Sequence, residues 1–163
     1  MPSVFCEQPV LPHPALFKAD WADRYAVIIP LSGLSALKAA QIALDRPPRW
    51  VGCLLAMRNM IVAPFGLRSA AMPAGQAGSV GAFPIVSERN DEVVLGFDDK
   101  HLDFRIVIDV AAGGEGGTKV SVTTLVQRHN IFGRLYILVV TPFHKVIVRT
   151  TLARLFDPAL ITR

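Results

Sequence analysis

Three ionisable side chains occupy alternate positions near the middle of the chain, at His101, Asp103 and Arg105. The residues between them are apolar, and alternation with a period of two predicts a strand with one buried face. Strand geometry then places the three polar side chains on one face, about 7 Å from one to the next. Such a group is typical of acid–base or anion-binding sites, but a solvated face with ordinary ion pairs explains the same pattern. Both interpretations stay open for this polar strand cluster.

Asp98 and Asp99 precede the cluster and offer carboxylates that a metal ion could use. Aspartates are also common in turns, because their side chains bond nearby backbone amides. The two cysteines lack metal-ligand spacing, and the chain has no second group of histidines and carboxylates. Gly113 to Gly117 is glycine-rich, but we expect it to join two strands, which is the wrong context for a phosphate-binding loop. We therefore predict no metal and no cofactor.

The last long element is a predicted helix from about Phe132 to Phe156. It is apolar almost all round, which is typical of a buried helix. Pro142 should kink it, because the proline ring removes one hydrogen bond and clashes with the preceding turn. Tyr136 and His144 lie about two turns apart on either side of this proline. A kinked helix over a curved sheet predicts a space between the two, in which these side chains are candidate polar groups.

Three more residues are candidates for the same space. Leu138 on the helix and Phe104 on the central strand would supply apolar wall, as in most small-molecule pockets. Arg58 interrupts an otherwise apolar helix that we predict from about Trp50. It is either an anchor for the polar end of a ligand or the exposed edge of that helix.

The chain is strongly apolar, because 52% of its residues are hydrophobic and its mean hydropathy is +0.41. This composition indicates either one large hydrophobic core or an apolar surface that serves a function. No uninterrupted apolar run reaches the length of a membrane-spanning helix, so we predict no transmembrane segment. The start of the chain lacks the basic and apolar parts of a signal peptide, and the cysteines suit reduced thiols. A cytoplasmic location is expected.

Positive charge is concentrated at the end of the chain. From Arg128 to Arg163 there are six basic residues and a single acid, Asp157, although the whole chain carries only +4. Interleaved exposed aromatics and a recognised nucleic-acid module are both missing there, so no nucleic-acid partner is predicted. The sequence does not indicate an oligomeric state.

The order of predicted elements gives an α+β chain. Residues 1–20, rich in proline, form an N-terminal extended arm, and residues 21–163 form a single domain. A strand near Arg24 to Leu31 and two shorter helices come first. Four antiparallel strands follow at 83–89, 92–97, 101–110 and 118–128, and the long C-terminal helix ends the domain.

Short motifs in this order carry a resemblance to a known family. They are Trp50, Met57-Arg58-Asn59, Phe65-Gly66-Leu67, Phe83-Pro84-Ile85, Asp98 to Arg105, His129-Asn130, Gly133 to Tyr136 and Pro142-Phe143-His144. Together they resemble the uncharacterised bacterial family numbered 2867 among domains of unknown function, over roughly residues 20 to 156. Members occur alone or behind a nucleotide-binding reductase-like domain.

The element order is also similar to the helix-grip fold of the START and pollen-allergen (SRPBCC) superfamily, in which an antiparallel sheet wraps round the last helix. That fold usually has seven strands, and the sequence here supports five. The N-terminal arm and the loop at 66–82 are the places where two more could lie. The resemblance implies an apolar cavity between sheet and helix, but no catalytic residue.

These observations leave three functional hypotheses. The first is a non-enzymatic domain that binds a small hydrophobic or amphipathic ligand between sheet and helix. The second is an enzyme of the same fold, of cyclase, dehydratase or hydrolase type, with His101 or His144 as general acid/base. The third is a membrane-surface or protein-interaction module that uses the basic C-terminal helix. A large closed cavity would favour the first, a histidine facing a carboxylate the second, and a basic face beside exposed Leu or Phe the third.

Overall fold

The computed structural model describes residues 3–45, 49–53, 63–65, 78–157 and 159. A seven-stranded antiparallel sheet runs in the order β1-β2-β7-β6-β5-β4-β3. The strands are β1 (Phe5–Glu7), β2 (Trp21–Ile29), β3 (Ser79–Val80), β4 (Phe83–Glu88), β5 (Glu92–Asp98), β6 (Leu102–Ala112) and β7 (Thr118–Arg128). The helices are α1 (Ala36–Leu44), η1 (Ala63–Phe65), α3 (Ile131–Ala153) and η2 (Arg154–Phe156), and residues 49–53 are also helical.

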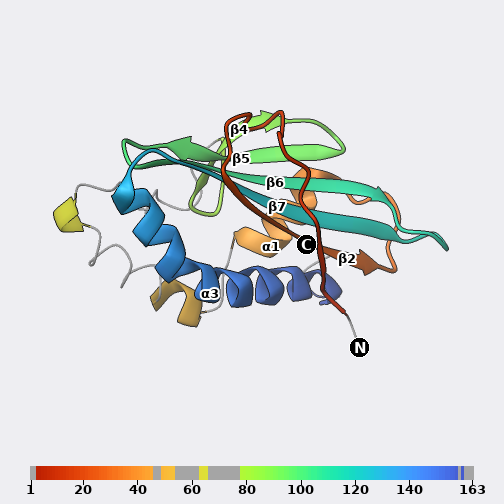
Figure 1. Cartoon of the computed structure of the whole chain (residues 1–163). Coiled ribbons are helices and arrows are strands. Elements are labelled where there is room, and N and C mark those ends of the chain that lie inside the picture. The colour runs from red at the N-terminus through yellow and green to blue at the C-terminus, as the bar shows by residue number, and fades with distance from the viewer. Residues whose placement is uncertain (1–2, 46–48, 54–62, 66–77, 158, 160–163) are drawn as a thin grey trace.

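The predicted α+β class is confirmed, with a long C-terminal helix against an antiparallel sheet in a helix-grip-like arrangement (Figure 1). The four consecutive strands predicted between residues 83 and 128 are β4 to β7, and each pairs with the next. The two strands that the sequence left unassigned are β1 and β3. They lie in the proline-rich arm and at the end of the 66–82 loop, and they pair with β2 and β4.

The two faces of the sheet differ in what covers them. On the inner face, Phe104, Ile106 and Ile108 of β6 lie opposite Val126, Thr124 and Val122 of β7. Figure 1 shows α1 and α3 on the same side of the sheet. The main buried cluster combines inner-face residues of the strands with residues of both helices: Tyr25, Val27, Ile29, Ala39, Ala40, Val93, Leu95, Ile106, Ile108, Val120, Val122, Val148 and Leu152.

The outer face has a smaller apolar cluster of Leu16, Val94, Val107 and Leu125. Leu16 comes from the N-terminal segment, which lies across the strands here. Part of the N-terminal segment therefore packs on the face opposite α3.

α3 begins at a well-formed cap. The Asn130 side chain accepts a hydrogen bond from the Gly133 amide at 3.1 Å, which satisfies one of the free donors at the helix start. A Cβ at position 133 would collide with the carbonyl oxygen of His101. Glycine is needed here because the helix start lies directly against the turn between β5 and β6.

The prediction that α3 is buried all round is wrong. Its buried residues, Gly133, Ile137, Val148, Thr151 and Leu152, lie on one side, while large apolar side chains on the other side are exposed. A single sheet can cover only one side of a helix that crosses its surface. Pro142 lies inside α3, and Figure 1 shows the helix bending along its length.

Candidate functional site

Beneath the middle of α3, the inner face of the sheet changes from apolar to polar. Asp23 of β2 and Thr124 of β7 are direct neighbours across the strand pair. Trp21 and Tyr25 flank Asp23 at the next inward positions of β2, since inward side chains alternate along a strand. Two polar residues therefore interrupt the face that packs against the helix.

His144 comes down from α3 onto this pair. Its Nε2 lies 3.2 Å from Asp23 Oδ1 and 3.1 Å from Thr124 Oγ1, and the Trp21 ring meets the imidazole edge-on with centroids 5.8 Å apart. The side chains of His144 and Asp23 are 17% and 13% exposed. We call Asp23, Thr124 and His144 the inner polar site.

Apolar contacts hold α3 to the sheet on both sides of this site. Toward the helix start, Ile137 packs with Leu102 and Val126, and Trp21, Phe104 and Tyr136 border the same cluster. Toward the helix end, Val148 and Leu152 join the main buried cluster. The inner polar site consequently sits between two apolar anchor points, near the proline of α3.

One oxygen of the site has no hydrogen-bond partner within the described part of the chain. It is Asp23 Oδ2, which is fully buried. Arg105 Nε and Ser121 Oγ share this condition, but both belong to the outer face of the sheet. An ionised carboxylate can only accept hydrogen bonds, and a buried acceptor without a donor is costly. This oxygen marks the place where a further donor would stabilise the molecule.

The polar strand cluster does not form one site. His101 precedes β6 and turns to the start of α3, where its Nδ1 lies 2.9 Å from Asn130 Nδ2. Asp103 pairs with His129 at 3.0 Å, and Arg105 pairs with Asp98 at 2.7 Å. The three residues have different partners, so separate hydrogen bonds and ion pairs describe the cluster better than shared acid–base chemistry.

The remaining candidate residues for ligand binding also lie in different places. Phe104 lies on the inner face against the rings of Phe83 and Phe97, with centroids 5.8 and 5.6 Å away. Tyr136 borders the apolar cluster around Ile137. Leu138 needs correction, because it is 72% exposed on the far side of α3 and does not face the sheet. A step of 100° per residue turns it away from the wall that Ile137 forms. Arg58 lies outside the described residues.

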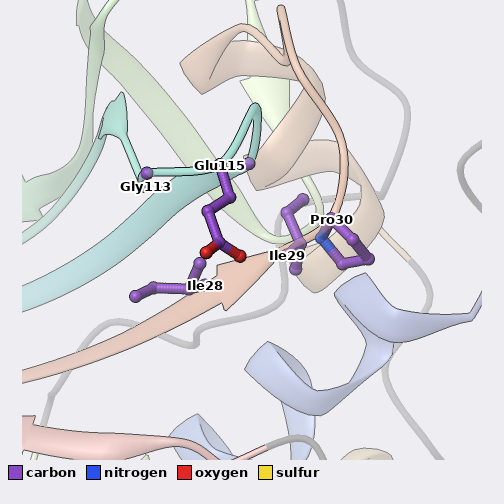
Figure 2. A pocket seen from close by; sticks show the side chains of 7 residues that line it. Ile28, Ile29, Pro30, Gly113 and Glu115 are labelled. Carbon is purple, nitrogen blue, oxygen red and sulfur yellow. The ribbon is translucent and has the colours of Figure 1, made fainter.

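A pocket of about 290 Å³ lies elsewhere, at the end of β2 beside the β6–β7 hairpin. Figure 2 shows Ile28, Ile29 and Pro30 on one side and Gly113 and Glu115 on the other. It is an open depression with one charged side chain, and it does not lie beneath α3. The predicted space between α3 and the sheet stays a prediction.

The outer face carries an ion-pair network that ties four strands together. Arg24 binds both Asp109 oxygens, at 2.7 and 2.9 Å, and its Nε reaches Glu7 at 3.0 Å. Lys119 pairs with the same glutamate. The hydrogen bond from Lys119, helped by that from Arg24, lowers the pKa of Glu7 below its ordinary 4.5. The network saturates its own charges and is structural in character.

Asp23 and Thr124 were missed by sequence reasoning, which began the first strand at Arg24. Extending the alternation backwards from Tyr25 would have placed Asp23 and Trp21 on the inner face. Thr124 stands among Val120, Val122 and Val126 at inward positions of β7. A polar residue on an otherwise apolar strand face was the available signal for both.

No group of three or more His, Cys, Asp or Glu side chains within the described ranges could hold a metal ion.

Comparison with known proteins identifies the family. The family model described as protein of unknown function (DUF2867) matches residues 15–151. The chain belongs to this family. No curated protein and no solved structure matches the chain significantly. A relationship to the SRPBCC superfamily stays a prediction, and the DUF2867 family supplies no residue roles.

Proposed function

We propose that this DUF2867 protein binds a small amphipathic molecule between α3 and the inner face of the sheet. The carrying observation is the buried Asp23 Oδ2, which has no partner among the described residues although it lies beside His144. Buried polar atoms in folded proteins are nearly always hydrogen-bonded, so an exception calls for a missing donor. A ligand that brings a donor would satisfy this oxygen.

The chemistry of the site selects the polar end of the ligand. Asp23 accepts hydrogen bonds, and a second carboxylate beside it would be repelled. A hydroxyl or ammonium group would be favoured, because it donates to Asp23 Oδ2. Thr124 offers a hydroxyl that both donates and accepts, which allows a second hydrogen bond.

The surroundings of the site select the rest of the molecule. Trp21, Phe104 and Val126 come from the sheet, and Ile137 and Tyr136 come from α3. Walls of this kind suit an alkyl chain or a fused ring, and a few polar groups then orient the ligand. The proposed ligand is accordingly apolar along most of its length, with one hydrogen-bond-donating end.

Binding of a dansyl-labelled alkylamine, followed by fluorescence, tests this proposal. Native protein should bind the amine with defined stoichiometry and more tightly than a dansyl-labelled fatty acid. Asp23→Asn should weaken the amine at least about tenfold, since a hydrogen bond to a charged group is worth about 1.5–3 kcal/mol. Two control variants should bind as wild type: Asp157→Asn, which removes an exposed carboxylate, and Leu138→Asp, which alters the far side of α3. Equal affinity for amine and fatty acid, or loss of binding in Leu138→Asp alone, would refute the proposal.

A second candidate function is acid–base catalysis at the same place, which the 3.2 Å contact between His144 and Asp23 favours. A carboxylate that fixes an imidazole is a recurring arrangement in enzymes, because it orients the ring for proton transfer. Mass spectrometry of a metabolite extract incubated with the protein would distinguish the two functions. A compound consumed by wild type and left intact by His144→Gln supports catalysis. A compound that is retained unchanged supports binding alone.

A further inference from the structure

The outer side of α3 exposes an unusual amount of apolar surface. Its large apolar side chains are between 47% and 72% exposed, and they follow one another at helical spacing: Ile131, Phe132, Leu135, Leu138, Val139, Phe143 and Val146. Residues three and four apart lie on the same helix face, so these side chains form one continuous stripe. We call it the α3 outer stripe. A contiguous apolar surface of this kind marks an interaction site.

The mean hydropathy of the helix also indicates exposed apolar surface. The stretch Ile131–Phe156 has a mean hydropathy of 1.5 over its most apolar window, of which 17% is buried. By length and composition it could cross a membrane. The sequence prediction counted uninterrupted apolar runs, and Arg134, Lys145 and Arg149 break those runs. The core helix of a soluble protein passes the same composition test, but such a helix is mostly buried.

The charges of α3 border the outer stripe on one edge. Arg134, Lys145 and Arg149 are all exposed, and α3 contains no acidic residue. Lys145 is eleven residues after Arg134, close to three full turns, and Arg149 follows one turn later. Arg134 and Lys145 therefore lie along the same side of the stripe, whereas the Arg149 guanidinium lies over the ring of Tyr25 at 5.6 Å, toward the sheet.

We propose that the α3 outer stripe docks on the surface of an anionic lipid bilayer. The stripe would enter the headgroup and acyl boundary to about 5–10 Å, while the basic edge meets lipid phosphates and carboxylates. A second copy of the chain fits less well, because neither α3 carries an acid to neutralise the basic edge of the other. Charge complementarity thus favours an anionic lipid surface.

The helix lies along this surface and does not cross it. Ile137, Val148 and Leu152 hold the inner side of α3 against the sheet, and a spanning orientation would expose all of them. The docking face is separate from the inner polar site, since the stripe residues are exposed whereas His144 is turned toward Asp23 and Thr124 on the sheet. The proposal is therefore independent of the ligand hypothesis.

Vesicle co-sedimentation tests it directly with the whole chain. Wild type should bind vesicles of phosphatidylcholine mixed with phosphatidylserine, should bind pure phosphatidylcholine weakly, and should be released by salt. Lys145→Glu and Leu138→Asp should each raise the lipid concentration for half-maximal binding about tenfold, because each change removes one attraction and adds a repulsion. Matched controls away from α3 are Lys18→Glu and Val86→Asp, both at exposed positions, and both should bind as wild type.

Three results would overturn the proposal. One is the absence of binding to anionic vesicles at low salt. Another is binding that the two control variants weaken as much as the α3 variants do. The third is a dimer in solution that Leu138→Asp converts to monomer without any vesicle binding, which would make the stripe an interface between copies. Circular dichroism of each variant checks that the fold is intact.

Discussion

Asp23 places a largely buried carboxylate on a sheet face that is otherwise mostly apolar. Its Oδ1 has His144 as a neighbour and its Oδ2 has none among the described residues. The free energy of burying this group depends on the few donors around it. Substitutions that remove those donors should therefore lower the free energy of unfolding.

His144→Ala tests this dependence. It removes the imidazole from Asp23 and should lower the free energy of unfolding by about 1–3 kcal/mol, because Asp23 Oδ1 and Thr124 Oγ1 both lose their imidazole neighbour. Urea denaturation followed by circular dichroism measures the change. The double variant Asp23→Leu with His144→Leu should recover part of the loss, since the buried carboxylate is gone while Thr124 Oγ1 still lacks its imidazole neighbour. If His144→Ala unfolds at the wild-type urea concentration, the contact with Asp23 contributes nothing.

β1 is a strand of three residues at the edge of the sheet, and ion pairs help to hold it there. It pairs with β2, and Glu7 fastens it further through Arg24 and Lys119. The hydrogen bond from Lys119 lowers the pKa of Glu7, so the folded state holds the proton less tightly than the unfolded chain does. Stability from this group is present above the ordinary pKa of 4.5 and is lost as pH falls below it.

Glu7→Gln should remove that pH dependence. Above pH 4.5 the variant should be less stable than wild type, by about 1 kcal/mol or less because the ion pair is partly exposed. Below that pH the two stability curves should converge. Thermal unfolding across acidic pH gives the comparison, and Glu88→Gln, an exposed glutamate of β4, is the matched control. Curves that stay parallel down to low pH would contradict the role assigned to Glu7.

At the scale of the whole molecule, period-two patterns predicted the central strands well. The runs around Leu102 to Val110 and Thr118 to Arg128 alternate over many residues and end at turn residues, so their class and their pairing followed from the chain. The short strands β1 and β3 carry too few residues to show a period. They pair with β2 and β4 because these strands would otherwise form the edges of the sheet.

The site was harder to predict than the fold. His144 was a candidate from the sequence, but its partners Asp23 and Thr124 come from strands far away in the chain. Leu138 was assigned to the wrong side of α3, because an apolar residue on an apolar helix carries no sign of which side meets the sheet. Which face is covered depends on the packing of the whole molecule.

Our proposals give α3 two functional sides, with a polar site for a ligand on the inner side. Amide chemical shifts of isotopically labelled protein, recorded while dodecylamine is added below its micelle concentration, test this claim most directly. We expect saturable shifts at Asp23, Thr124 and His144, with small effects at Leu138 and Val139. Shifts confined to Leu138 and Val139, with the inner polar site unchanged, would contradict the claim.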